Sequence, residues 1–285
     1  MTTTKVFGAW WFGRAPVGQV GPGKARLVRA KIRRAAAGMV CAALALSAAA
    51  QAAKPRKKLL AAKQAAYDAN FRNDARGLQE AAEKLDALTA DRKLGAFALY
   101  YAGWTRWSLA AAQLQANQKD EAVASLSRSV EDLEKAVALL PDNAEFQSQL
   151  ASSLISVAAV DRTKMAQILP EMTKHRKRAL ELAPASPRVV MMDAGMIFYT
   201  PEQYGGSQEK GITRWREAIR LFEAERIEDA IQPDWGRALA YGWLANMYLG
   251  MNPPRTAEAK EMANHALELR PDFWFVKTQV LPKVS

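Results

Sequence analysis

Three stretches of this chain repeat one pattern: residues 136–146 read AVALLPDNAEF, residues 179–189 read ALELAPASPRV, and residues 266–276 read ALELRPDFWFV. In each stretch an alanine- and leucine-rich helix pattern ends at a proline that follows the first alanine by five positions. Small alanines let helices approach closely, and a proline ends a helix because it has no N–H to donate. The fixed φ of proline also suits the start of the next helix. We therefore predict three helix–turn–helix joints, with Pro233 as a fourth joint of the same kind.

Helical periodicity continues through nearly all of the chain beyond residue 53, and no stretch alternates as a β-strand would. Prolines and glycines mark the joints, with Pro170 among the predicted stop signals. The expected helices cover about residues 57–71, 75–90, 93–116, 120–140, 143–159, 171–183, 187–199, 207–226, 236–250 and 255–270, with a short one near 273–280. Because alternating helices with short loops pack as antiparallel hairpins, the predicted fold is all-α, an irregular solenoid of about five helical hairpins.

The clearest hairpin covers residues 241–271. Its sequence resembles the tetratricopeptide repeat (TPR) at Tyr241, Leu244, Ala245 and Tyr248 in the first helix and at Ala259, Ala266 and Pro271 in the second. Ala263 departs from the family pattern, which usually has an aromatic residue there. A looser unit has Gly103 in the small position of its first helix. The resemblance, over about residues 93–275, implies a TPR-like solenoid whose first helices line a concave groove.

The net charge of +11 belongs mainly to the first part of the chain. Residues 1–52 contain basic residues and no acidic one, so the remainder is close to neutral. A basic stretch at residues 26–34 precedes an apolar run at 35–50, and Ala50-Gln51-Ala52 supplies an A-x-A cleavage site. The chain thus divides into an N-terminal extension (1–25), a signal peptide (26–52), N-terminal helices (53–92) and the repeat domain (93–285).

This division predicts a periplasmic or secreted protein. The apolar run is short for a permanent anchor, so no stable membrane span is expected after cleavage. A near-neutral exported chain without a known nucleic-acid-recognition motif is also a poor candidate for binding nucleic acid. A lipoprotein signal needs a small residue before its cysteine, and Val40 before Cys41 is not one, so we expect no lipid anchor. No cysteine follows Cys41, so the mature chain cannot form a disulfide and packing alone must stabilise the fold.

The sequence offers little for catalysis. His175 and His265 lie far apart without metal-ligand spacing, and the mature chain would have no thiol nucleophile. Residues 18–24, GQVGPGK, have the spacing of a phosphate loop, but Ala25 replaces the residue that would hold magnesium and no strand precedes. We therefore expect no catalytic residue, no metal site and no cofactor.

Two further segments have both a structural and a functional interpretation. The basic run at residues 174–178 is spread around its helix, which favours a solvated surface, although an acidic partner or anionic lipid would also suit it. Residues 201–207, PEQYGGS, form a joint in which the glycines permit a left-handed turn and Ser207 caps the next helix, with Glu209 in its first turn. A similar Tyr-Gly-Gly loop gives the chain a likeness to the T-components associated with TRAP transporters.

The aromatic residues are the remaining candidates. Large rings beside small residues suit packing between repeats, whereas rings on first helices would line the groove. The candidates for the groove are Tyr101, Trp104, Trp243 and Tyr204. We therefore predict a non-catalytic, exported scaffold that binds a protein or peptide partner of the cell envelope. The alternative is a periplasmic carrier or accessory protein that encloses a small apolar ligand for a transport system.

Overall fold

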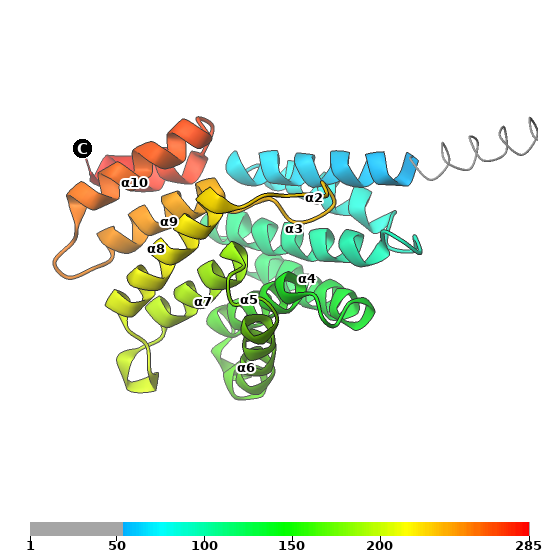
Figure 1. The fold of residues 1–285 in the computed structure, drawn as a ribbon, viewed down its shortest axis with the longest axis horizontal. Coiled ribbons are helices and arrows are strands. Elements are labelled where there is room, and N and C mark those ends of the chain that lie inside the picture. Colours follow the sequence, from blue (N-terminus) through cyan, green and yellow to red (C-terminus); the bar gives the residue numbers. More distant parts are fainter. Residues whose placement is uncertain (1–53, 285) are drawn as a thin grey trace, which may run out of the picture. The chain divides into compact units, whose positions relative to one another are not determined.

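The computed structural model describes residues 54–284, so the predicted extension (1–25) and signal peptide (26–52) lie outside the described residues. These described residues form one compact unit (Figure 1). Between residues 54 and 284 the secondary structure is helical and contains no β-strand. The predicted all-α, helical-hairpin architecture is confirmed.

The helices follow the predicted positions closely. A helix over residues 54–71 comes first. It is followed by α2 (Ala75–Asp86), α3 (Gly95–Gln115), α4 (Lys119–Leu139), α5 (Ala144–Val160), α6 (Met165–Leu182), α7 (Pro187–Tyr199), α8 (Gln208–Ala224), α9 (Arg237–Leu249) and α10 (Thr256–Leu269), then by a π-helical turn at Val276–Val280.

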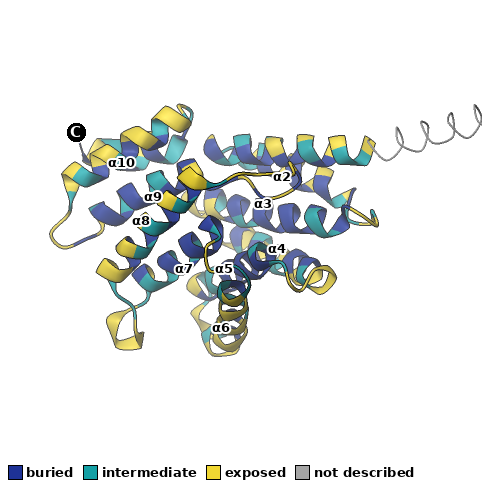
Figure 2. Ribbon diagram, viewed as in Figure 1, coloured by how far each residue is buried: buried dark blue, intermediate teal, exposed yellow. Residues whose placement is uncertain are grey.

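Consecutive helices pack as hairpins, with α3 on α4, α5 on α6, α7 on α8 and α9 on α10. The helix at 54–71 packs on α2 through Ala69 and Leu78. Between hairpins, α3 contacts α5 and α5 contacts α7, so these first helices form one layer. Buried residues lie where helices face each other, and the outward faces are exposed (Figure 2). One apolar core runs through the unit.

The three repeated joints are confirmed. Ala136, Ala179 and Ala266 are buried, and each carbonyl accepts the backbone N–H that ends its helix. In the first two joints the next helix is capped by Asn143 and Ser186, whose side chains accept backbone N–H groups. The branched or aromatic residues that follow the prolines are fully buried: Phe146, Val189 and Val276. The same local chemistry thus produces the same turn three times.

One predicted joint is wrong, and a second is of another kind than predicted. Pro170 lies inside α6, which begins at Met165, because Ile168 and Met172 pack into the core on either side of it and outweigh one missing hydrogen bond. Pro233 does lie between two helices, as predicted, but α8 already ends at Ala224, so the proline does not end a helix as in the three repeated joints. It belongs to a long connection between α8 and α9, residues 225–236, which includes a turn at 229–232. We call residues 225–236 the strap.

The first helix meets the C-terminal turn. The rings of Phe71 and Phe273 pack edge to face with centroids 5.0 Å apart. Arg270 lies over the Phe71 ring, 4.1 Å from its centroid, and donates to the Asp68 carboxylate at 3.1 Å. The two ends of the helical unit are therefore in contact, which sequence periodicity did not indicate.

Gly103 is the small residue at which α3 approaches α4. A Cβ at this position would lie 2.6 Å from Cγ of the fully buried Leu133. We expect Gly103→Ala to lower the free energy of unfolding by about 1–2 kcal/mol, because overpacking outweighs the better helix propensity of alanine. Urea unfolding followed by circular dichroism measures the change. Gly250→Ala is the control, since a Cβ there meets nothing closer than 3.5 Å; equal losses in the two variants would contradict the close approach.

Candidate functional site

Two of the predicted groove residues lie on the layer of first helices. Tyr101 and Trp104 belong to α3, and each side chain is only 1% exposed. We call the side of this layer that carries Tyr101 and Trp104 the inner face. The strap covers it: the chain leaves the end of α8 and crosses to α3 before α9 begins (Figure 1). Tyr101 donates its hydroxyl to the carbonyl of Ile231 at 2.6 Å. In this structure neither aromatic side chain is accessible to a partner.

Lys63, from the first helix, holds the middle of the strap. Its ammonium donates to the carbonyls of Ala230 at 2.8 Å and Gln232 at 2.9 Å, and pairs with the Asp234 carboxylate at 2.7 Å. The side chain is only 4% exposed. Burial lowers the pKa of Lys63 from its ordinary value, and the Asp234 carboxylate partly offsets that effect.

Arg188, on α7, holds the end of the strap and is 3% exposed. Its guanidinium donates to Glu145 of α5 at 2.9 Å, to Glu225 at the start of the strap, and to the carbonyl of Trp235 at 2.7 Å. Burial alone would lower the pKa of Arg188, but Glu145 and Glu225 raise it above the ordinary value. A permanently charged guanidinium thus ties α5 and α7 to both ends of the strap.

The other two predicted residues lie in different surroundings. Trp243 of α9 is half-buried and stacks on Phe275 with ring centroids 4.6 Å apart. Tyr204 is 75% exposed, in the short 3₁₀ turn Glu202–Tyr204. The structure confirms the predicted joint, since Gly205 has φ +88° and Ser207 caps α8 with Glu209 in its first turn. The four aromatic candidates therefore do not form one site.

The basic run at 174–178 is neutralised within the chain. Lys174 pairs with Glu171, Lys177 with Glu181, and Arg178 with Asp142. Arg176 pairs with the buried Asp193 of α7. His175 lies 2.6 Å from the Gln147 side chain, and burial lowers the pKa of its imidazole. His175, Arg176 and Arg178 therefore join α6 to its neighbours, whereas the Lys174 and Lys177 pairs are exposed contacts within α6.

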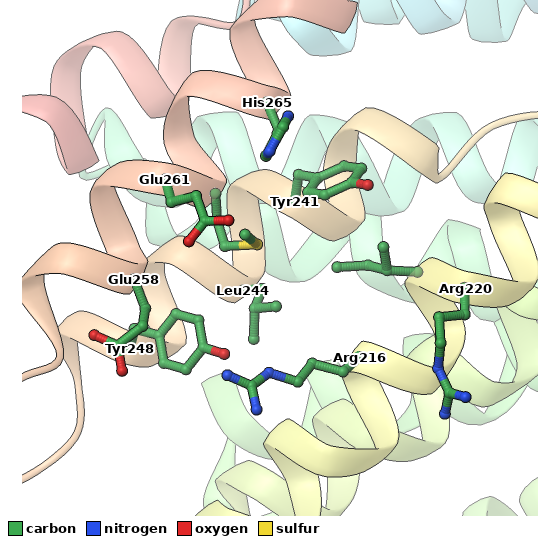
Figure 3. Close-up of a pocket in the computed structure, with 10 residues that line it drawn as sticks. Arg216, Arg220, Tyr241, Leu244, Tyr248, Glu258, Glu261 and His265 are labelled. Carbon is green, nitrogen blue, oxygen red and sulfur yellow. The ribbon is translucent and has the colours of Figure 1, made fainter.

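An open cleft lies between α8, α9 and α10, and sequence reasoning did not identify it (Figure 3). Its volume is about 480 Å³. The lining residues come from the three helices in turn: Arg216, Ile219 and Arg220; Tyr241, Leu244 and Tyr248; and Glu258, Glu261, Met262 and His265. The size falls within the range of small-molecule and peptide sites.

The floor of the cleft is apolar and fixed. Leu244 is fully buried, Ile219 is buried beside it, and the Tyr248 ring is buried at one end. The Arg216 guanidinium lies over the Tyr248 ring, 5.5 Å from its centroid, which orients the arginine at low entropic cost. Burial raises the pKa of Tyr248, and its hydroxyl can donate to a ligand.

The two rims carry opposite charges. Arg216 and Arg220 are one helical turn apart on α8, and Glu258 and Glu261 share a face of α10 (Figure 3). Within residues 54–284, no carboxylate lies within ion-pair distance of either arginine, and no basic group lies that close to either glutamate. Elsewhere most arginines of the unit are paired. These four charges are thus available to a ligand.

The upper end of the cleft is held by polar contacts. Tyr241 donates its hydroxyl to Glu223 at 3.1 Å, and Arg237 also binds that carboxylate. Burial raises the pKa of Tyr241, and Glu223 adds to the effect. The His265 imidazole packs on the Tyr241 ring at 5.4 Å and lies 3.1 Å from Glu268. His265 thus lines the cleft, with Tyr241 and Tyr248 from the TPR-like pattern.

The cleft combines a hydrophobic floor, two aromatic hydroxyl groups and facing rims of opposite charge. No group of three or more His, Cys, Asp or Glu side chains suited to a metal ion occurs in the part of the chain that the structure describes. Within the same residues, none of the helices has the length and apolar character needed to cross a bilayer.

No known protein-family model matches this chain, and no curated protein sequence matches it. Among solved structures, the chain is similar to the HusA haemophore from Porphyromonas gingivalis, with 23% sequence identity and a TM-score of 0.49. That match covers 66% of this chain and 94% of the haemophore chain. A likeness of this size carries no inference about what this chain binds.

Proposed function

We propose that this chain is a non-catalytic, exported scaffold that binds a segment of a partner protein in the cleft between α8, α9 and α10. The observation that carries the proposal is the pair of unpaired, oppositely charged rims above an apolar floor. A peptide segment with an acidic side chain toward Arg216 and Arg220 and a basic one toward Glu258 and Glu261 would match both rims. Export rests on the signal-like residues 26–52, and the TPR-like solenoid on the resemblance at residues 241–271.

The carrier alternative has less support in this cleft. A small apolar ligand favours an enclosed, apolar pocket. Here the cavity is open, and charged residues of α8 and α10 form its edges (Figure 3). Tyr101 and Trp104, the aromatic residues that would enclose a carried ligand, are instead covered by the strap.

Charge reversal on the α8 rim tests the proposal. The double variant Arg216→Glu, Arg220→Glu would place like charges opposite Glu258 and Glu261 and repel the acidic part of a partner. We expect capture of the partner from a cell-envelope extract to fall about tenfold or more, which corresponds to a loss of about 1.4 kcal/mol. Capture is measured by quantitative mass spectrometry after affinity purification of the full chain.

The matched control is Arg92→Glu, Lys93→Glu. Both residues are exposed, lie in the connection between α2 and α3, and give the same change in net charge. A protein that is captured by the native chain and by this control, but not by the cleft variant, is the partner that the proposal requires. Capture that is equal in all three chains would contradict binding in the cleft.

A further inference from the structure

The strap contacts the inner face in the manner of a bound peptide. Its apolar residues Ile231, Pro233 and Trp235 are buried, and the intervening Gln232 and Asp234 are exposed. The chain turns at residues 229–232, where the Gln232 N–H donates to the Asp229 carbonyl, and has no regular secondary structure over residues 233–236. Every second side chain from 231 to 235 is buried against the helical layer, and Pro233 has no N–H that needs a partner.

Side chains of the helical layer bind the backbone of this segment. The carbonyls of residues 230 and 232 accept from Lys63, that of Ile231 accepts from Tyr101, and that of Trp235 accepts from Arg188. These donors come from three different helices: 54–71, α3 and α7. Main-chain groups bound in this way give affinity, while pockets for alternate side chains give specificity.

Trp235 is the anchor of the segment. Its indole Nε1 donates to the Tyr100 hydroxyl at 2.9 Å, and its ring packs on Trp104 with centroids 5.5 Å apart. Trp104 contributes a buried indole Nε1 that has no acceptor among the described residues. The inner face therefore offers one donor that the strap does not use.

The preceding part of the strap is held by few contacts. Residues 226–230 are exposed, and two contacts link this part to the first helix: the exposed ion pair of Arg56 with Asp229, 2.5 Å long, and the hydrogen bond from Lys63 to the Ala230 carbonyl. These residues provide slack, so residues 231–235 can leave the surface while α8 and α9 stay folded. Opening of this kind is a local event, distinct from global unfolding.

From these contacts we infer that the inner face is a second peptide-binding surface, separate from the cleft, and that the strap is its built-in occupant. The surface recognises segments with an apolar residue, a proline and a tryptophan at alternate positions, as in residues 231–235. A tethered segment faces its own site at an effective concentration on the order of mM, so an external peptide binds only when the strap is weakened or outcompeted.

A peptide with the sequence of residues 228–236, EDAIQPDWG, is the probe. The full native chain should bind it poorly because the strap occupies the site. The double variant Ile231→Ala, Trp235→Ala removes two side-chain anchors of the strap but leaves Lys63, Tyr101 and Arg188 in place. We expect this variant to bind the labelled peptide at least about tenfold more tightly than the native chain, measured by fluorescence anisotropy.

Three comparisons make the test specific. Lys63→Met in the weakened background should abolish binding, a scrambled peptide should not bind, and Arg216→Glu, Arg220→Glu in the cleft should change nothing. The inference is overturned if the weakened variant keeps its helical circular dichroism but does not bind the peptide, or binds the scrambled peptide equally well.

If the weakened variant does not fold, hydrogen exchange on the native chain tests the inference instead. The inference requires the backbone amides of residues 231, 232 and 234–236 to exchange faster than those in the middle of α8 and α9, through local opening. Exchange of the strap at the rate of global unfolding would show that it is an inseparable part of the core, and the inference would fail.

Discussion

Replacing Arg188 with methionine is expected to lower the free energy of unfolding by about 3–5 kcal/mol, because the change leaves two carboxylates without a counter-charge. Glu145 and Glu225 both bind this guanidinium and are largely removed from water. The substitution also removes the donor to the Trp235 carbonyl and so releases the end of the strap. Urea unfolding of the full chain, followed by circular dichroism, measures the loss.

An exposed ion pair provides the control. Arg178 pairs with Asp142 at 2.6 Å, but both side chains are exposed. Arg178→Met should therefore cost less than about 1 kcal/mol. Adding Glu145→Gln and Glu225→Gln to Arg188→Met should recover part of the stability, since the uncompensated charges are removed. A loss for Arg188→Met that is no larger than that for Arg178→Met would mean that the buried cluster does not hold the strap.

Alkaline pH is expected to destabilise the unit steeply. Burial raises the pKa of Tyr67, Tyr100 and Tyr101 well above the ordinary value. Their stabilising contribution is complete below the unfolded-state pKa of about 10 and is lost as pH rises beyond it, because the unfolded chain releases protons that the folded chain retains. Three such protons correspond to about 4 kcal/mol for each pH unit.

Titration of Lys63 changes the free energy of unfolding in the opposite direction, over a lower pH range. Because its folded pKa is lowered, the unfolded chain binds the proton more strongly, and stability increases with pH up to about 10.4. Above that pH the raised pKa values of the buried tyrosines make stability fall. We therefore expect stability to fall between pH 10.5 and 11.5, as measured by urea unfolding at several pH values.

Tyrosinate absorbance at alkaline pH identifies the groups responsible. It should appear for Tyr67, Tyr100 and Tyr101 only as the helical signal is lost. Tyr100→Phe, the matched variant, should reduce the slope of stability against pH by one proton, about 1.4 kcal/mol per unit. Ionisation of these tyrosines in a chain that is still helical would contradict their burial.

The sequence was sufficient for the helices and most joints because these depend on local chemistry. Alanine spacing, caps such as Ser186 and a proline after the helix end act within a few residues. Pro170 shows the limit of that reasoning, because the burial of Ile168 and Met172 keeps α6 continuous through a residue that usually ends a helix. Pro233 shows a second limit: its role depends on Lys63 and Tyr101, far away in the sequence.

The candidate site was less predictable for the same reason. Tyr101 and Trp104 were identified as aromatic residues of a first helix, but only the fold shows that the strap covers them. Arg216 and Glu258 look like ordinary solvated residues in the sequence. They become a site because α8 and α10 face each other across α9 and leave their charges unpaired.

The sequence by itself determined the helical hairpins and three of their joints, since periodicity, caps and prolines are local signals. The tertiary structure alone decided how the strap lies on the inner face, how the first helix meets the C-terminal turn, and where the open cleft lies. These features depend on contacts between residues that are far apart in the chain. No local pattern encodes such contacts, because each partner is compatible with an ordinary surface or core position until the helices pack.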